Sequence, residues 1–434
     1  MPISDNEARR AIQEALSQVR VVDPHTHLSP RRPTARNLAD VVLYHHVWIE
    51  LVSAGMGQRE TNATGMPHEL ENPVVEPAER IRRALPWLPR IRNTAVAMML
   101  RWVLEDVYGF HETLDAGNAE RLARIVAERA GDAGWEERLF TQVCGIERSI
   151  SVQTTDPTLN RRILAASEAL GKVNLTDGKR APREVLSDLD ARLGREVRTA
   201  ADYCAALDTV LASLPVASLK FLGAWVSPAF APDLATETDV TRIIGLAREG
   251  RPASAVEMGS VAWFGLTHCL ERLRATPLRT IQVILGAEVL VPHRSLTQWG
   301  GEFAMSFGRF AGQFEDFHFN MSTAAEAHIQ DLAILAKHVP NISVAGYWWH
   351  TFYPSLIRKS LEMRLEMVPM GKIIGFFSDA YHAEWCYPKL KLVKLVLEDI
   401  LCDRVRRGWY TLDDALAVIP AILHDAPKRI YATG

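Results

Sequence analysis

The sequence predicts an α/β fold in which parallel strands close into a (β/α)8 barrel. Short apolar runs rich in β-branched residues alternate with longer helical stretches. Seven runs are visible, at residues 21–22, 150–153, 216–221, 280–286, 317–321, 341–346 and 373–377. Most intervening stretches are long enough for the crossover helix that parallel strands need. We expect the eighth strand near residues 172–174.

A chain of 434 residues suits either two or three average domains or one barrel with insertions. We interpret residues 1–434 as a single barrel domain. Residues 38–144 show helical periodicity and no convincing strand, so we expect a helical insertion after the first strand. An insertion at that end of a strand would lie over the catalytic face of a barrel and could act as a lid.

Composition limits the partners of the protein. Lys and Arg number 49 against 52 Asp and Glu, and the pI is about 6.5, which argues against a nucleic-acid partner. No stretch approaches the roughly 18 apolar residues of a membrane span, and the N-terminus lacks an apolar signal core. The five cysteines include no CxxC pair, so we expect a cytoplasmic protein. A small molecule is the expected partner, and homo-oligomerisation is left open.

Two histidines follow the first apolar run. His25 and His27 are two residues apart, so on a strand both side chains point to the same side. At the mouth of a barrel that side is the interior, where both rings can bind one divalent ion. The alternative is a purely structural pair, because His-x-His occurs often by chance.

A carboxylate follows the last apolar run. Asp379 comes directly after residues 373–377 and Ser378, where it could complete a metal site and shuttle a proton. The alternative is that Asp379 caps the following helix. Because of the histidine pair, we favour the ligand interpretation.

A second pair of histidines, His45 and His46, opens the expected insertion and suits acid–base chemistry near neutral pH. Adjacent residues on a helix point about 100° apart, so we expect only one of the two to face the site.

Several further residues could bind substrate. Trp348 and Trp349 follow the run at residues 341–346 and would either wall a pocket or pack in the core. His293 and Arg294 would supply an anion-binding cation or lie in an exposed loop. Lys220 is a lone charge in an apolar run, which would be a ligand bridge or a base if it points inward and would snorkel if it points outward.

The histidine pair and the Ser-Asp at residues 378–379 resemble the amidohydrolase superfamily, whose barrel is of the metal-dependent hydrolase type. Gly-Tyr-Trp-Trp-His at residues 346–350, Met-Arg-Leu-Glu-Met at 363–367 and Phe-Ser-Asp-Ala at 377–380 resemble the uronate isomerases, particularly their shorter branch. Leu-Tyr-His at residues 43–45 and Thr-Asp-Pro at 155–157 add to this resemblance.

The resemblance implies an enzyme that moves a proton between C1 and C2 of an open-chain hexuronate beside one divalent metal ion. His25, His27 and Asp379 would hold the ion, with Asp379 near the moving proton. Zinc is favoured, and Mn, Fe or Co would also suit these ligands. We place His45, His46 and Tyr381 with Asp379 among the catalytic candidates.

The departures from the family pattern concern substrate binding. Tyr381 stands where the family has an arginine, His46 stands where the short branch usually has tyrosine, and residues 172–177 contain no counterpart of the family's arginine near the third strand. An arginine guanidinium pairs with a carboxylate through two hydrogen bonds, and neither Tyr381 nor Leu175 can replace its charge. A standard hexuronate therefore needs Arg294 or another cation in the pocket.

Three functions follow from these observations. The first is a metal-dependent isomerase acting on a hexuronate or related sugar acid. The second is a metal-dependent hydrolase or lyase of the superfamily with a different small substrate. The fifth expected strand, at residues 282–286, lacks the histidine typical of hydrolytic members. The third is a degenerate barrel retained as a binding or scaffold protein.

Overall fold

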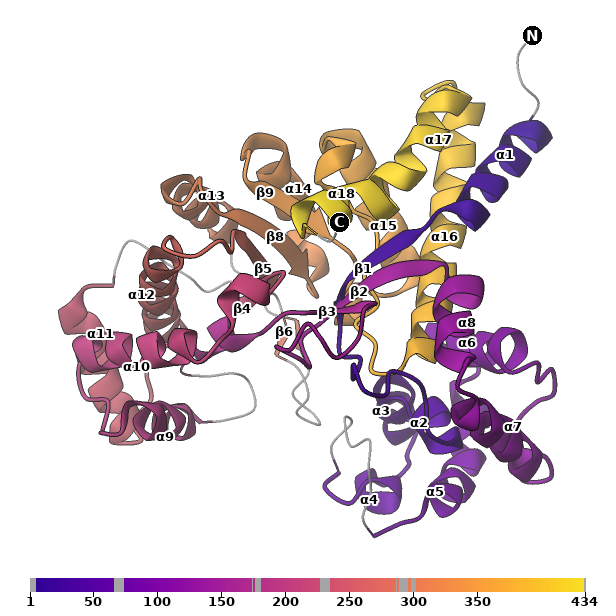
Figure 1. Cartoon of the computed structure of the whole chain (residues 1–434), viewed down its shortest axis with the longest axis horizontal. Coiled ribbons are helices and arrows are strands. Elements are labelled where there is room, and N and C mark those ends of the chain that lie inside the picture. Colours follow the sequence, from indigo (N-terminus) through magenta and orange to yellow (C-terminus); the bar gives the residue numbers. More distant parts are fainter. Residues whose placement is uncertain are drawn as a thin grey trace.

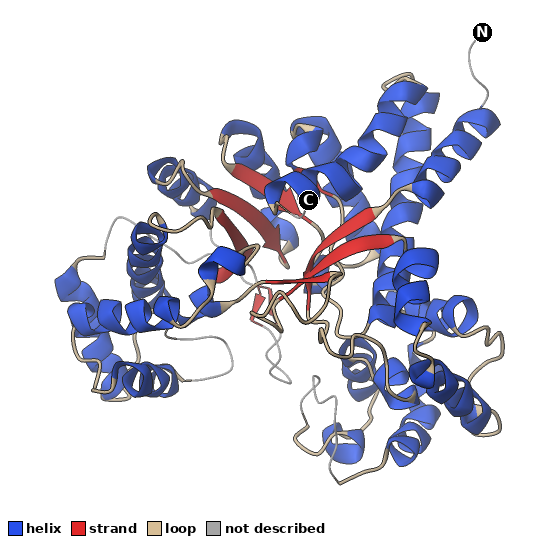
Figure 2. Ribbon diagram, viewed as in Figure 1, coloured by secondary structure: helices blue, strands red, loops and turns tan. Residues whose placement is uncertain are grey.

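Parallel strands at the centre of the molecule form two sheets, and helices surround them (Figure 2). The computed structural model describes residues 5–65, 74–173, 175, 181–226, 235–285, 287–288, 296–297 and 302–432. One sheet has the order β1 (Val21–Thr26), β2 (Ile146–Ser151), β3 (Ile163–Ala165). The other has the order β10 (Ile373–Ile374), β9 (Ile342–Ala345), β8 (His318–Thr323), β5 (Thr280–Leu285), β4 (Leu222–Val226). Every pairing within these two sheets is parallel.

Backbone hydrogen bonds join the two sheets at both margins. Ser167, just after β3, bridges Leu222 of β4, and the Gly223 amide donates to the Ser167 carbonyl at 2.7 Å. At the other margin the Asp379 amide donates to the His25 carbonyl at 2.9 Å, and the His27 amide donates to the Ala380 carbonyl at 2.8 Å. The ends of β1 and β10 therefore lie side by side.

Helices connect the strands (Figure 1). The α-helices outside the β1–β2 connection are α1 (Asp5–Gln18), α9 (Pro182–Leu193), α10 (Ala200–Ala212), α11 (Glu237–Arg248), α12 (Ala255–Leu273), α13 (Phe303–Gln313), α14 (Ile329–His338), α15 (Pro354–Met367), α16 (Ala383–Arg406), α17 (Leu412–Pro420) and α18 (Ala426–Ile430). Shorter turns are η4 (Ala169–Val173), η5 (Val216–Ser218), η7 (Glu326–His328), η8 (Trp349–Thr351), η9 (Met370–Lys372) and η10 (Ala421–Asp425). A small antiparallel pair, β6 (Ala287–Glu288) and β7 (Leu296–Thr297), follows β5.

The chain between β1 and β2 contains a series of helices that form a lobe of their own at the lower right of Figure 1. They are α2 (Leu38–Val42), α3 (His45–Ser53), α4 (Gln58–Thr61), α5 (Pro77–Ala84), η1 (Leu85–Ile91), α6 (Ala95–Trp102), η2 (Val103–Val107), α7 (Ala119–Gly131), α8 (Trp135–Arg138) and η3 (Leu139–Cys144). Glu384 of α16 attaches this lobe, because its fully buried carboxylate accepts hydrogen bonds from the Tyr108 hydroxyl and the Trp135 indole.

Two strand predictions were wrong. Residues 216–218 form the 3-10 helix η5, and the strand β4 begins only at Leu222, where pairing with β5 starts. Lys172 and Val173 belong to the 3-10 helix η4, whereas Asn174 lies outside the described residues. The missing strand is β3, which is only three residues long, too short to show a two-residue periodicity.

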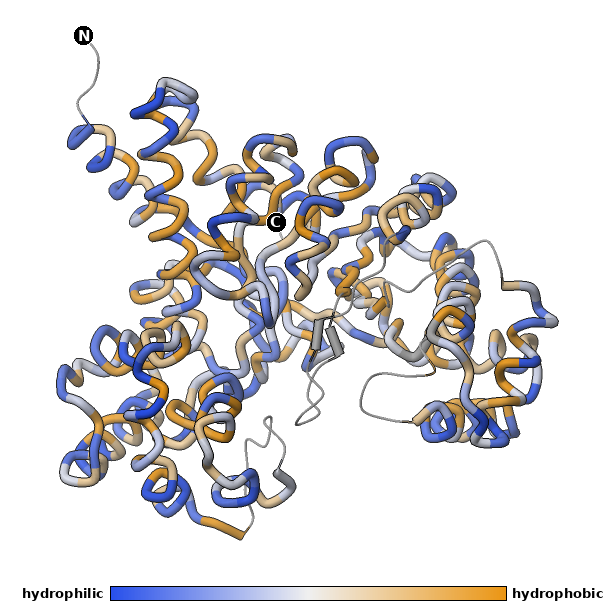
Figure 3. Tube along the Cα trace, turned by 180° about the vertical axis from the view of Figure 1, so that it is seen from behind, coloured by the Kyte–Doolittle hydropathy of each residue, from blue (hydrophilic) through white to orange (hydrophobic). Residues whose placement is uncertain are grey.

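The surrounding helices mix apolar and polar residues along their length (Figure 3), as expected for helices with one buried face. Within the described ranges, no helix combines the length and the apolar character that crossing a membrane requires.

Gly346, at the end of β9, has the left-handed backbone angle φ +30°. A Cβ atom at this position would lie 2.4 Å from Cδ1 of Phe377, well inside contact distance. Both restraints require glycine here, in the turn that leads to Trp348 and Trp349.

We predict that Gly346→Ala lowers the free energy of unfolding by about 2–4 kcal/mol, through backbone strain and overpacking. Gly245→Ala is the matched control, because it lies within α11 with nothing within 4 Å of the added Cβ. It should stabilise the protein by roughly 0.5–1 kcal/mol. Denaturant unfolding of both variants measures the difference, and equal stabilities would contradict the prediction.

Candidate metal centre

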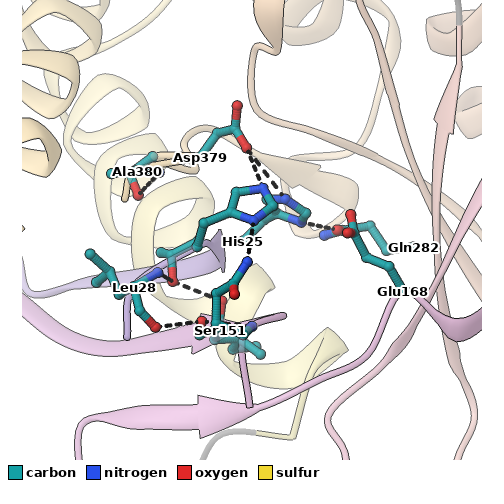
Figure 4. Close-up of polar contacts among 12 residues, drawn as sticks. His25, Leu28, Ser151, Glu168, Gln282, Asp379 and Ala380 are labelled. Carbon is teal, nitrogen blue, oxygen red and sulfur yellow. Dashed lines mark hydrogen bonds and ion pairs between the residues drawn. The ribbon is translucent and has the colours of Figure 1, made fainter. Parts of the chain in front are cut away.

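His25, His27 and Asp379 form one cluster, in which His25 belongs to β1, His27 follows it and Asp379 lies in the segment after β10. Figure 4 shows His25 beside Asp379. Nε2 of His27 lies 3.2 Å from Oδ1 of Asp379, and Nε2 of His25 lies 3.5 Å from the same oxygen. Ligands about 2.0–2.2 Å from a tetrahedral ion lie roughly 3.3 Å from one another. The three residues therefore fit a single divalent ion, and this buried cluster could hold a metal.

Asp379 itself has a left-handed backbone, with φ +51°, which is strained for a residue other than glycine. The side chain of Lys389, on α16, stabilises this turn. Its ammonium group is buried and donates to the Ser378 carbonyl at 2.6 Å and to the Asp379 carbonyl at 3.5 Å. The Tyr44 hydroxyl donates to the same Asp379 carbonyl at 3.3 Å. The sequence analysis missed Lys389, although a lysine on the apolar face of a helix is a signal for such a contact.

The charges of the cluster are mutually stabilising. Burial alone would raise the pKa of Asp379, but hydrogen bonds from His25 and His27 and the nearby charges of His27 and Lys389 hold that pKa well below its usual range. Burial would also lower the pKa of His25, but the hydrogen bond and charge of Asp379 outweigh it and raise the pKa.

Both His45 and His46 approach the same carboxylate. One ligand atom of each lies within 4.8 Å of the other and of an Asp379 oxygen. The expectation that only one would face the site was wrong, because the two imidazole rings converge to 4.1 Å between centroids although both residues belong to α3. The His45 ring stacks on Trp349 at 5.7 Å between centroids, and the His46 ring lies 4.9 Å from Trp349.

Tyr381 covers the other side of the cluster. Its ring stacks on His27 with centroids 4.6 Å apart and planes 5° apart, and it meets His45 edge-on at 5.2 Å. Burial and the charges of Asp379 and Glu168 raise the pKa of Tyr381 far above its usual range. The side chain is therefore a phenol whose hydroxyl can donate a hydrogen bond.

The two tryptophans have different surroundings. Trp349, with φ +51°, lies against the two histidines of α3. Trp348 packs edge-on against Trp225 at 5.1 Å between centroids. Both are largely buried.

Glu168 is an acidic residue near the site that the sequence analysis missed. It follows β3, its Oε1 accepts a hydrogen bond from the Trp225 indole at 3.2 Å, and Figure 4 shows it beside Gln282. Its charge contributes to the raised pKa values of His25 and Tyr381. Placing the third strand at residues 163–165 would have identified Glu168 as a strand-end carboxylate.

The remaining candidates lie away from the cluster or outside the description. Nζ of Lys220 donates to the Ala432 carbonyl at 2.7 Å, so it holds the end of the chain and is neither a ligand bridge nor a base. His293 and Arg294 lie outside the described residues.

The chain is similar to uronate isomerases over nearly its full length. A uronate isomerase from Phenylobacterium zucineum is 22% identical, over 97% of this chain and 93% of the relative. The glucuronate isomerase structure from Caulobacter crescentus superposes with a TM-score of 0.79 at 16% identity, covering 99% of this chain and 94% of that one. The uronate isomerase structure from Thermotoga maritima gives 0.75 at 14% identity, covering 99% and 100%. No protein-family model matches the chain.

The pKa shifts predict how stability depends on pH when the protein is free of metal. The contribution of His25 is complete below its ordinary pKa of 6.5 and is lost as pH rises through its raised folded value. The contribution of Asp379 is present above 3.8 and is lost only in strong acid. Asp379→Asn should therefore lower the free energy of unfolding by roughly 3 kcal/mol at pH 5.5, and by less at pH 9.

Denaturant unfolding at the two pH values in the presence of a chelator measures this difference. Asp316→Asn is the matched control, because this carboxylate is exposed in its pair with Arg274, and its loss should cost at most about 1 kcal/mol at either pH. A loss for Asp379→Asn that grows with pH would contradict the assigned charges.

Proposed function

We propose, from the place of this chain as a distant member of the uronate isomerase family, that it is a metal-dependent aldose–ketose isomerase acting on a hexuronate or related sugar acid. The observation that carries the proposal is the convergence of His25 and His27 on one oxygen of Asp379, at 3.5 and 3.2 Å. One such cluster inside the fold of a uronate isomerase-like protein is what single-metal isomerisation requires.

A divalent ion held by these three residues would supply positive charge that polarises the oxygens bound to C1 and C2 of the sugar. Two imidazoles and a carboxylate suit zinc, and also Mn, Fe or Co. Zinc is our proposal because its preferred tetrahedral arrangement matches the ligand spacing.

The proton transfer would fall to groups around the cluster. His45 and His46 adjoin the Asp379 carboxylate and can accept or donate a proton near neutral pH. Asp379 would act beside them, and the protonated Tyr381 hydroxyl would orient a substrate oxygen. Trp349 and Trp348 would wall the pocket, with His293 and Arg294 supplying the cation for the substrate carboxylate.

We further propose that residues 1–434 form one (β/α)8 barrel, with residues 38–144 as an inserted helical lid. The backbone hydrogen bonds between β3 and β4 and between the ends of β1 and β10 support closure. We also propose a cytoplasmic location, supported by five cysteines that are all free thiols. Homo-oligomerisation is compatible with this proposal.

Glu168 favours a second candidate function. A carboxylate near His25 and Tyr381 would repel a uronate anion, whereas it would bind a hydroxyl or a cationic group. The second candidate is therefore a metal-dependent hydrolase or lyase acting on a neutral or cationic small molecule.

The isomerase proposal predicts that zinc-loaded protein interconverts at least one aldose–ketose pair in a panel of hexuronates. In D2O, NMR should show deuterium incorporated at the carbon that receives the proton. Asp379→Asn should reduce turnover by about 10²–10⁴-fold, whereas Asp316→Asn should leave it unchanged. An inert hexuronate panel, together with turnover of esters or lactones, would instead establish the second candidate.

Glu168→Gln distinguishes the two substrate classes by charge. Removing a carboxylate near the candidate metal centre should tighten binding of a uronate roughly tenfold. The reason is that the negative charges of Glu168 and of a uronate bound at this centre would repel each other by about 1–2 kcal/mol. KM measured with the hexuronate that turns over fastest tests this effect, with its uncharged hexose analogue as the control. Weaker uronate binding in the variant would mean that Glu168 holds a substrate hydroxyl.

A further inference from the structure

A layer of buried polar side chains lies inside the larger sheet, behind His25. Gln282 of β5 is in register with Asn320 of β8, and Asn320 is in register with Ser343 of β9. All three are fully buried. Buried polar groups are costly unless each is hydrogen-bonded, so each of these side chains needs a hydrogen-bond partner.

The layer forms one continuous chain of hydrogen bonds that begins at the candidate metal ligand His25. Nδ1 of His25 lies 2.5 Å from Oε1 of Gln282, and Nε2 of Gln282 donates to the Tyr431 hydroxyl at 2.8 Å. The Tyr431 hydroxyl donates to Oδ1 of Asn320 at 2.5 Å, and Nδ2 of Asn320 donates to the Ser343 hydroxyl at 2.6 Å. Nε2 of His318 lies 2.8 Å from that hydroxyl.

Tyr431 reaches this layer from the end of the chain, and three contacts hold it there. The Lys220 ammonium binds the Ala432 carbonyl at 2.7 Å, and the Thr280 hydroxyl donates to the Ile430 carbonyl at 2.8 Å. The Phe221 ring meets Tyr431 edge-on at 5.5 Å and also stacks on His25 at 6.1 Å. The lone charge of the apolar run at residues 216–221 therefore anchors the segment that carries Tyr431.

The direction of these hydrogen bonds determines which nitrogen of His25 carries the proton. If Gln282 accepts from Nδ1, then Nε2 keeps its lone pair on the side of His27 and Asp379, where an ion would bind. If the side-chain amides of Gln282 and Asn320 were both turned round, Gln282 would donate to Nδ1 of His25. Nε2 of His25 would then carry the hydrogen and could not bind a metal. Oε1 of Gln282 faces Nδ1 of His25 at 2.5 Å, and Nε2 of Gln282 donates to the Tyr431 hydroxyl. This is the first direction, because an amide oxygen can only accept.

We propose that Gln282 and Tyr431 are positioning residues that hold His25 in the tautomer able to bind the metal ion. Asn320 and Ser343 fix the direction of the chain at its far end, where His318, whose pKa burial lowers to about 4, is neutral and can accept a hydrogen bond. Tyr431, in the segment that follows α18, thus takes part in orienting His25. This inference rests on the metal site of the proposed function.

The test measures zinc affinity by competition with a chelator, and the His25 tautomer by NMR of protein carrying ¹⁵N only in histidine. Gln282→Leu should weaken zinc binding roughly 10–100-fold, and Tyr431→Phe roughly fivefold. Gln282→Glu keeps the acceptor and should retain zinc affinity within about threefold. In metal-free protein at alkaline pH, the unaltered chain should show the Nδ1–H tautomer, and Tyr431→Phe should show both tautomers.

Tyr203→Phe is the matched control, because Tyr203 is an equally buried tyrosine on α10, and it should change neither readout. The inference is overturned if Tyr431→Phe equals Tyr203→Phe in zinc affinity and tautomer. If Gln282→Leu does not fold, the contrast between Gln282→Glu and Tyr431→Phe decides by the same criteria. Failure of the unaltered chain to bind zinc would instead contradict the proposed function.

Discussion

The site depends on one turn, in which Asp379 adopts a left-handed backbone between the end of β10 and helix α16. This conformation turns the carboxylate toward His25 and His27, while the Asp379 amide binds the His25 carbonyl. A strained turn persists only when its surroundings over-determine it. Here the buried Lys389 ammonium donates hydrogen bonds to the carbonyls of Ser378 and Asp379, and these bonds help to hold the strained turn.

Helix α16 joins this turn to the helical lobe between β1 and β2. Lys389 supports the Asp379 turn, and Glu384, on the same helix, accepts hydrogen bonds from Tyr108 and Trp135 of the lobe. Tyr44 connects the two directly, because its hydroxyl contacts both the Asp379 carbonyl and the Lys389 ammonium. The position of His45 and His46 beside the carboxylate is therefore coupled to the geometry of the candidate metal ligands.

The polar interior behind His25 shows a second kind of coupling. Polar side chains are buried in register across β5, β8 and β9, and Tyr431 from the far end of the chain completes their hydrogen bonds. Each of these groups would be costly alone. As a connected set they are satisfied, and they give His25 a defined partner on the side away from Asp379.

The sequence by itself determined the features that depend on neighbours along the chain. Alternating apolar runs predicted the parallel α/β fold, and the two-residue spacing of His25 and His27 predicted that both rings share a side. Short motifs such as residues 346–350 indicated the similarity to uronate isomerases that the full-length comparison also finds. Each of these signals is local, so no knowledge of distant contacts was needed.

The tertiary structure alone decided what depends on residues far apart in the sequence. β3 was too short to be recognised, so Glu168 beside it was missed. Lys389 contacts Tyr44, and Tyr431 contacts Gln282, across long separations in the sequence. His45 and His46 both approach Asp379 because their rings converge, and the direction of each ring is not given by the position of its residue around the helix. Periodicity reports which face of an element is buried, whereas the partner of a buried polar group is set only when the strands and helices pack together.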